Sequence, residues 1–304
     1  MAQSHGYDAT LVFGLETSEG TPATSYKWLS PIEEMEVEES ENYESQPALG
    51  FRNPFGIRGG NKEIDMSATL TLQNGRVFLL ALGKMETSGD ESTGYTHVIK
   101  PVGVAETLPS FSAQIHDPTH NLTTTYTGGK VDTLSLSLTP GEKVEAELEA
   151  QFVNVDIQQS PSSVVAEDVP YFMSHEATVS INDVTEKDVV ELEVEFSNSL
   201  DRKFTLNNSR NPERILEGIT EVTAELTFNF TNPGTLTALR NGTPINLKVE
   251  LNRLDGEKIV VELLDGVYDS SSIPINPEEG REIELEAIFK NIQVTVNTDQ
   301  ETLF

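Results

Sequence analysis

Apolar and polar residues alternate along most of the chain with a period of two, the pattern of strands that bury one face. In residues 63–72 and 221–230 every second residue is apolar, and residues 144–152 and 282–289 alternate between apolar side chains and mainly glutamates. These four stretches predict half-buried strands with one strongly polar face. Shorter stretches predict further strands at 32–39, 110–116, 131–138, 177–181, 189–196, 245–251, 259–263 and 292–296.

Only two segments are predicted to be helical, 75–84 and 234–241. Each follows one of the long alternating strands and reaches Gly83 or Gly242, residues suited to the end of a helix. The dipeptide Asp255-Gly256 lies between two predicted strands and is typical of a hairpin turn. The chain is therefore predicted to be mainly β, with two short α-helices.

The sequence also repeats itself. Arg52-Asn53-Pro54 returns 158 positions later as Arg210-Asn211-Pro212, and about thirty following residues align without a gap. A second block, Glu147–Phe152, matches Glu284–Phe289 at a shift of 137, which assigns about 21 extra residues around 85–107 to the first copy. Two copies are too few for a solenoid. We expect two similar β-sandwich or barrel domains, 1–160 and 161–304, that meet at a polar stretch.

Composition narrows the possible partners. Fifty Asp and Glu against 20 Lys and Arg give a formal charge of −30, which repels nucleic acid and anionic membranes at low salt. Molar salt screens this repulsion, so the balance fits a halophilic origin. The chain has no cysteine, the first residues do not have the pattern of a signal peptide, and no apolar run reaches the ~18 residues of a membrane helix. We expect a soluble protein assembled inside a cell.

The order of predicted elements resembles a known family. The tail tube proteins of long-tailed viruses have this order: a strand pair, a long loop, a long alternating strand, one short helix and then more strands. The local sequences Leu15–Pro22, Gly94–His97, Leu108–Ser112 and Gly128–Val131 are similar to the branch with tandem domains. The resemblance covers nearly the whole chain. Together with the acidic composition, it suggests a virus of haloarchaea.

The resemblance implies a structural virion protein of the viral tail, a major tail protein with no enzymatic activity and no cofactor. Subunits of this family form rings that stack into a hollow tube for genome ejection. If each domain takes one of six positions, a homotrimer closes a ring with pseudo-sixfold symmetry. The implied partners are other copies, other tail proteins at the tube ends, and double-stranded DNA in passage without specific binding, with no membrane. Assembly would occur in the host cytoplasm.

Acidic strand faces would suit the wall of such a channel, because carboxylates repel DNA phosphates. An ordinary solvated face adapted to salt would have the same composition. The candidates for the channel wall are Glu36, Glu38, Glu63, Asp65, Thr69, Glu193, Glu195, Glu221, Thr223 and Glu225.

The segment 40–61 is too long for a hairpin connection, and its repetition argues for a function. Tail tube proteins use a loop at this position for stacking, and basic groups here could bind an acidic neighbour. The candidate stacking residues are Arg52, Asn53 and Arg58 in the first loop, with Arg202, Lys203, Arg210, Asn211 and Arg214 in the second.

Other chemical interpretations are weaker. His116 and His120 are separated by Pro118, which disfavours a helix that would pair them on a metal. Gly128-Gly129-Lys130 does not have the spacing of a phosphate-binding loop. Acidic loops could bind calcium weakly, but none has the ligand pattern of an EF-hand. Two rival classes stay open, a secreted or surface-layer β-sandwich adhesion module of a halophilic archaeon and a glycan-active β protein.

Overall fold

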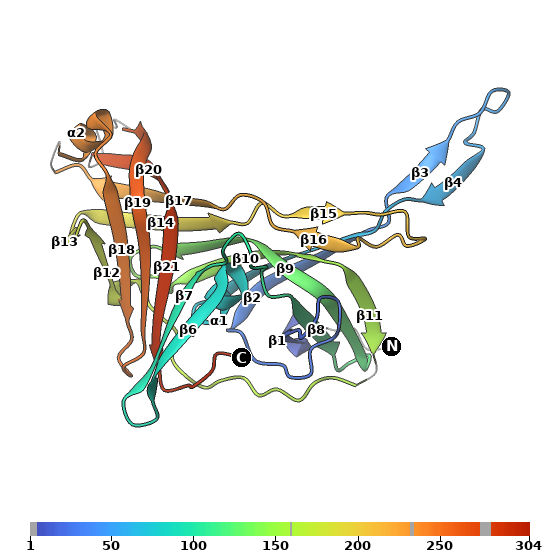
Figure 1. The fold of residues 1–304 in the computed structure, drawn as a ribbon, viewed down its shortest axis with the longest axis horizontal. Helices are drawn as coiled ribbons and strands as arrows, with labels where there is room; N and C mark the ends of the chain where they lie inside the picture. The colour runs from blue at the N-terminus through green and yellow to red at the C-terminus, as the bar shows by residue number, and fades with distance from the viewer. Residues whose placement is uncertain (1–4, 159, 232–233, 274–280) are drawn as a thin grey trace.

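The fold is mainly β, as predicted, and contains two short α-helices (Figure 1). The computed structural model describes residues 5–158, 160–231, 234–273 and 281–304. One continuous apolar cluster fills the space between a central sheet and two side sheets. Two short 3₁₀ turns, Gly6–Asp8 and Ser174–Glu176, precede the first strands of the two halves of the chain.

The central sheet contains eight antiparallel strands and spans both halves of the chain. Its order is β2–β5–β10–β9 from the first half, followed by β14–β17–β20–β19 from the second. The pairing of β9 with β14 joins the halves across the expected domain boundary. The bounds are β2 Ile32–Ser40, β5 Glu63–Thr71, β10 Glu145–Phe152, β9 Leu122–Leu138, β14 Val189–Ser197, β17 Glu221–Asn229, β20 Glu282–Phe289 and β19 Lys258–Ser272.

Strand order and register recur between the two groups of four strands. The β2–β5 and β14–β17 pairs have a bulge at the same place, where Glu33 and Val190 have no direct partner. The β9–β10 and β19–β20 pairs also share a bulge, at Asp132 and Asp269. A bulge is a specific device for setting register and twist. Each strand of the first group therefore has a counterpart in the second. The counterpart of β2 is β14, that of β5 is β17, that of β10 is β20 and that of β9 is β19.

The side sheets lie against the central sheet and share its longest strands. β9 and β19 pass from a side sheet into the central sheet, and Gly129 and Gly266 lie at these crossings. A Cβ atom on either glycine would come within 2.4 Å of Phe152 or 2.2 Å of Phe289, so only glycine fits there. The first side sheet is β1 Thr10–Leu15, β8 Phe111–Asp117, β9 and β11 Asn154–Gln158.

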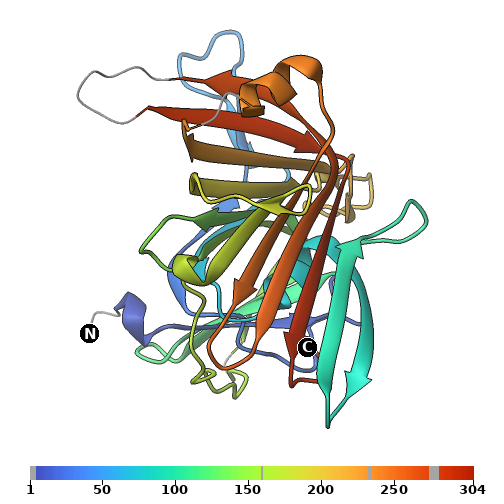
Figure 2. The same cartoon turned by 90° about the vertical axis from the view of Figure 1, so that its left-hand side faces the viewer.

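The second side sheet recruits a hairpin from the other half of the chain. Its order is β13 Val184–Thr185, β12 Ala177–Ile181, β18 Ile245–Asn252, β19, β21 Asn291–Thr298, β7 Gly94–Pro101 and β6 Gly83–Asp90. The β6–β7 hairpin belongs to the first half and lies beside β21 (Figure 2). The β6–β7 hairpin contains most of the residues around 85–107 that the first copy of the repeat has and the second copy does not.

The two helices occupy different environments. α1, Arg76–Leu82, is buried at every residue, and Gly83 with a φ of 88° ends it, as predicted. α2, Gly234–Asn241, lies at the edge of the second half, with Gly234 and Arg240 exposed. Gly242 follows it with a φ of 58°.

Two hairpins project from one end of the central sheet (Figure 1). The expectation that 40–61 is an unpaired loop was wrong: β3, Tyr43–Gln46, and β4, Gly56–Gly59, pair along it. We call residues 41–61 the first arm. The second arm, residues 200–217, contains β15, Asp201–Lys203, and β16, Arg214–Leu216.

Candidate assembly surfaces

One face of the central sheet is lined with carboxylates. Along β2, β5, β14 and β17 the apolar residues point into the core, and the intervening polar residues point to the opposite face. We call this the acidic face. It carries all ten residues predicted for a channel wall, Glu36, Glu38, Glu63, Asp65, Thr69, Glu193, Glu195, Glu221, Thr223 and Glu225.

The charges on this face are close enough to affect one another. Glu193 lies directly opposite Glu225 across the β14–β17 pair. Partial burial raises the pKa of Glu193, and the carboxylates of Glu225, Glu195 and Glu147 raise it further. Burial and neighbouring acids likewise raise the pKa of Glu149. Glu147 and Glu149 lie on β10 in the middle of this face, and their alternation in 144–152 was the signal that could have added them to the candidates.

Neutralising one of these glutamates should stabilise the protein at low salt. A raised folded-state pKa means that folding disfavours the charged form, so this group's contribution to stability improves as pH falls through that pKa. Glu193→Gln is therefore expected to raise the melting temperature at neutral pH and low salt, and the gain should shrink at molar salt, because salt screens the neighbouring carboxylates but not the cost of burial. The matched control is Glu86→Gln on exposed β6. An equal shift in both variants would contradict the coupling of Glu193 to its neighbours.

In the part of the chain that the structure describes, the central sheet has two edges without a strand partner. Among the described residues, β2 pairs only with β5, and the segment 267–272 of β19 pairs only with β20. Their counterparts inside the sheet, β14 and β9, pair with each other. An exposed strand edge presents free N–H and C=O groups and readily accepts another strand. The two edges are therefore candidate contacts between chains.

The first arm exposes large apolar side chains. Tyr43, Leu49, Phe51, Phe55 and Ile57 are all at least 62% exposed. The rings of Phe51 and Phe55 form an edge-to-face pair at 5.5 Å near the tip. Contiguous apolar surface of this kind marks a contact site. The predicted stacking residues Arg52, Asn53 and Arg58 also lie on this arm and are exposed.

The second arm is held against the first half of the same chain. Arg202 donates to Ile64 O at 2.7 Å and pairs with Asp65 at 2.6 Å. Arg210 donates to Gly60 O at 2.6 Å and pairs with Glu41 at 2.6 Å. Of the other candidates, Asn211 donates to Asn154, Lys203 pairs with Asp201, and Arg214 is exposed.

These arrangements agree with a comparison against protein families. The family model described as phage tail tube protein matches residues 6–288. The chain belongs to this family. A search of curated proteins finds no match. The family identifies a structural component of a viral tail, and within the described residues no helix is long and apolar enough to cross a membrane.

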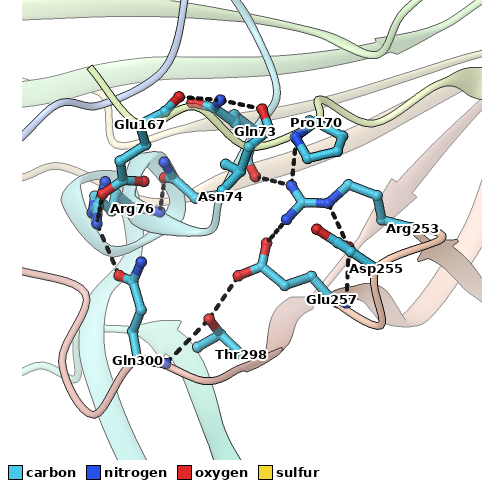
Figure 3. A network of polar contacts seen from close by, with 11 residues as sticks. Gln73, Asn74, Arg76, Glu167, Pro170, Arg253, Asp255, Glu257, Thr298 and Gln300 are labelled. Carbon is cyan, nitrogen blue, oxygen red and sulfur yellow. Dashed lines mark hydrogen bonds and ion pairs between the residues drawn. The ribbon is translucent and has the colours of Figure 1, made fainter.

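A buried polar network joins the two halves of this tail tube protein (Figure 3). Arg76 on α1 is 1% exposed and donates to Leu303 O, Trp28 O, Glu167 and Gln300 at 2.5–2.9 Å. It thereby ties the C-terminal segment to the first half. Arg253 is 5% exposed, donates to Gln73 O and Pro170 O, and pairs with Asp255 and Glu257.

The two histidines considered for a metal have separate partners. His116 Nδ1 lies 3.0 Å from Thr123 Oγ1, and His120 Nδ1 lies 2.8 Å from Asp117 Oδ2. Across the described ranges, no group of three or more His, Asp or Glu side chains is arranged to hold a metal ion. The candidate functional surfaces of this chain are its sheet edges, its acidic face and its arms.

Proposed function

We propose that three copies of this chain close a ring and that stacked rings form the tail tube. The observation that carries the proposal is the recurrence of strand order and register within the central sheet. β9 and β14 form the junction between the two groups of four strands. The free edges of the sheet are β2 and β19, which are the counterparts of β14 and β9.

The same junction can therefore form between chains. If β19 of one chain pairs with β2 of the next, each contact repeats the geometry of the β9–β14 contact. An interface between two different surfaces closes into a ring when its rotation divides a full turn. Six equivalent groups of four strands, two per chain, would give the pseudo-sixfold symmetry expected for two tandem domains, 1–160 and 161–304.

The β9–β14 pairing also predicts the register between chains. Glu195 lies opposite Ser135 at that junction, and their counterparts are Glu38 and Ser272. A Glu38→Cys, Ser272→Cys double variant is expected to form disulfides between chains under mild oxidation, because directly opposite residues have the Cα separation that a disulfide needs. The chain has no native cysteine to compete.

Two controls sharpen this test. Glu195→Cys with Ser135→Cys should form a disulfide within one chain. Glu36→Cys with Ser272→Cys is two residues out of register and should react poorly. Non-reducing electrophoresis separates the products, and covalent species no larger than three chains are expected from closed rings. Intermolecular bonding equal in the in-register and shifted variants, or a closed ring of six chains, would contradict the proposal.

The acidic face would form the wall of the channel. Its carboxylates, including Glu193 and Glu225, would repel the phosphates of double-stranded DNA and allow passage without specific binding. The first arm, with Arg52, Asn53 and Arg58, would contact the next ring. In the second arm Arg202 and Arg210 would position the base of the first arm. Lys203, Asn211 and Arg214 remain candidates for contacts across the stack.

The net charge bears on the source of the protein and on the conditions under which it assembles. The net charge of −30 favours assembly at high salt, and so a virus of haloarchaea as the source. Assembly would take place in the host cytoplasm, and other tail proteins would bind the two ends of the tube. Electron microscopy of the purified protein at molar salt tests the proposal directly. Rings or tubes support it, and monomers under all salt conditions would overturn it.

A further inference from the structure

The two halves of the chain differ at the end of the central sheet that lies opposite the arms. In the first half, Leu72 N donates to Val144 O at 2.8 Å, and Phe172 is inserted beside this pair. Phe172 N donates to Leu72 O and Val144 N donates to Phe172 O, both at 2.9 Å. The Phe172 side chain is fully buried. The segment between the two halves thus closes the core of the first half with an aromatic plug.

The second half has the same bond but a cavity beside it. Phe230 N donates to Arg281 O at 2.8 Å, the counterpart of the bond from Leu72 to Val144. Phe172 N donates to Leu72 O in the first half, but within the described residues no backbone N–H donates to Phe230 O in the second half. A cavity of about 450 Å³ lies at this end. We call it the α2 cavity, and its apolar lining includes Ile181, Val184, Phe228, Phe230, Ile245 and Tyr268.

The α2 cavity is suited to aromatic side chains. Burial and the nearby carboxylate of Glu186 raise the pKa of Tyr268 to about 12. An apolar cavity of roughly 150 Å³ is enough to bind benzene. The α2 cavity is larger, and the apolar part of its lining leaves room for phenyl rings beside polar groups such as Asn182 and Thr243. Glu186 and Asp188 also line it and supply negative charge.

The chain exposes its aromatic side chains mainly on the first arm. Tyr43, Phe51 and Phe55 are three of the four exposed aromatic residues in the described part of the chain, and the fourth is Tyr171. Phe51 and Phe55 already contact each other, so little side-chain freedom is lost when they bind. Arg52 and Arg58 beside them are complementary in charge to the acidic lining of the α2 cavity.

The arm and the cavity lie at opposite ends of the central sheet. β2 and β14 run in the same direction, because four antiparallel pairings separate them. The first arm follows the end of β2, whereas Asp188 directly precedes β14 (Figure 1). In a stack of rings, an arm that leaves one end of a ring meets the opposite end of the next.

We propose that the aromatic tip of the first arm, Phe51 and Phe55, occupies the α2 cavity of a second copy in the adjacent ring. Each chain has one such tip, because Leu206 is the one large apolar side chain exposed on the second arm and Phe204 there is half-buried. Phe172 fills the place in the first half that corresponds to the α2 cavity, so the described residues form one cavity of this kind per chain. The inference rests on the proposed tube and identifies which surfaces stack.

Photochemical cross-linking tests this contact in the assembled protein. With p-benzoylphenylalanine in place of Phe55, irradiated tubes are expected to give cross-links to 181–188 or 226–231 of another chain, identified by mass spectrometry. The same photoreactive residue in place of Tyr171 is the control and should not label these segments. Tubes that cross-link elsewhere would overturn the inference alone. If no tubes form at any of the salt concentrations tested, the proposed function would be overturned as well.

A pair of variants separates stacking from ring closure. Phe51→Ala with Phe55→Ala is expected to leave separate rings that no longer form tubes, whereas Leu206→Ala on the second arm should form tubes normally. Ring closure in both is measured by the disulfide between Glu38→Cys and Ser272→Cys. If the double alanine variant loses both the disulfide and the tubes, the arm has a role within the ring and the inference is wrong. If the double alanine variant still forms long tubes, the cavity contact is refuted.

Discussion

Replacing Arg76 with methionine is expected to lower the free energy of unfolding by about 3–5 kcal/mol, the cost of breaking a buried charged pair by removing one partner. Arg76 is 1% exposed and donates to the carbonyl oxygens of Trp28 and Leu303 and to Glu167 and Gln300. Methionine fills much of the volume but leaves these acceptors without their donor. The C-terminal segment should separate from α1.

Urea unfolding at molar salt, followed by the fluorescence of the single tryptophan Trp28, measures this loss. The free energy of unfolding of Arg76→Lys should lie between those of the wild type and Arg76→Met. An ammonium group keeps the charge but cannot reach four acceptors as the planar guanidinium does. Arg58→Met on the exposed first arm is the control, with an expected change within about 0.5 kcal/mol. A loss below about 1 kcal/mol in Arg76→Met would show that the network does not hold the halves together.

The strands of the central sheet were predictable because their burial is one-sided. In 63–71 and 221–229 every second residue enters the core, so the period of two is visible in the sequence alone. The position of the acidic face followed from the same alternation. The two helices were predictable from their places after the long alternating strands and from the glycines Gly83 and Gly242 that end them.

Pairings between distant segments were not predictable in this way. β6 has only exposed and half-buried residues, and β7 buries only His97 and Ile99, so neither shows a long alternation. The place of β7 is fixed by its pairing with β21, which comes much later in the chain. The first arm was interpreted as a loop because its strands are almost wholly exposed and show no alternation. Likewise, Arg202 and Arg210 have partners in the first half that only the tertiary structure brings near.

Reversing charge on the acidic face is expected to slow DNA release. In a triple variant, Glu36→Lys, Glu193→Lys and Glu225→Lys, the new ammonium groups would face the channel and bind phosphates. Folding should be nearly unaffected, since these side chains point away from the core. Asp65 is left unchanged because it pairs with Arg202. The attraction involves counterion release, so it weakens as salt rises.

The measurement is the rate of genome ejection from particles that carry the variant tube, as a function of ionic strength. The control, Glu86→Lys, Glu91→Lys and Glu301→Lys, makes the same change in net charge at exposed positions outside the central sheet. Ejection should be slow at low salt and recover partly at high salt in the first variant only. Because both variants have equal net charge, equal slowing would indicate a general effect of charge on the particle. An unchanged rate in the first variant would place the acidic face outside the channel, without affecting the pairing of β19 with β2.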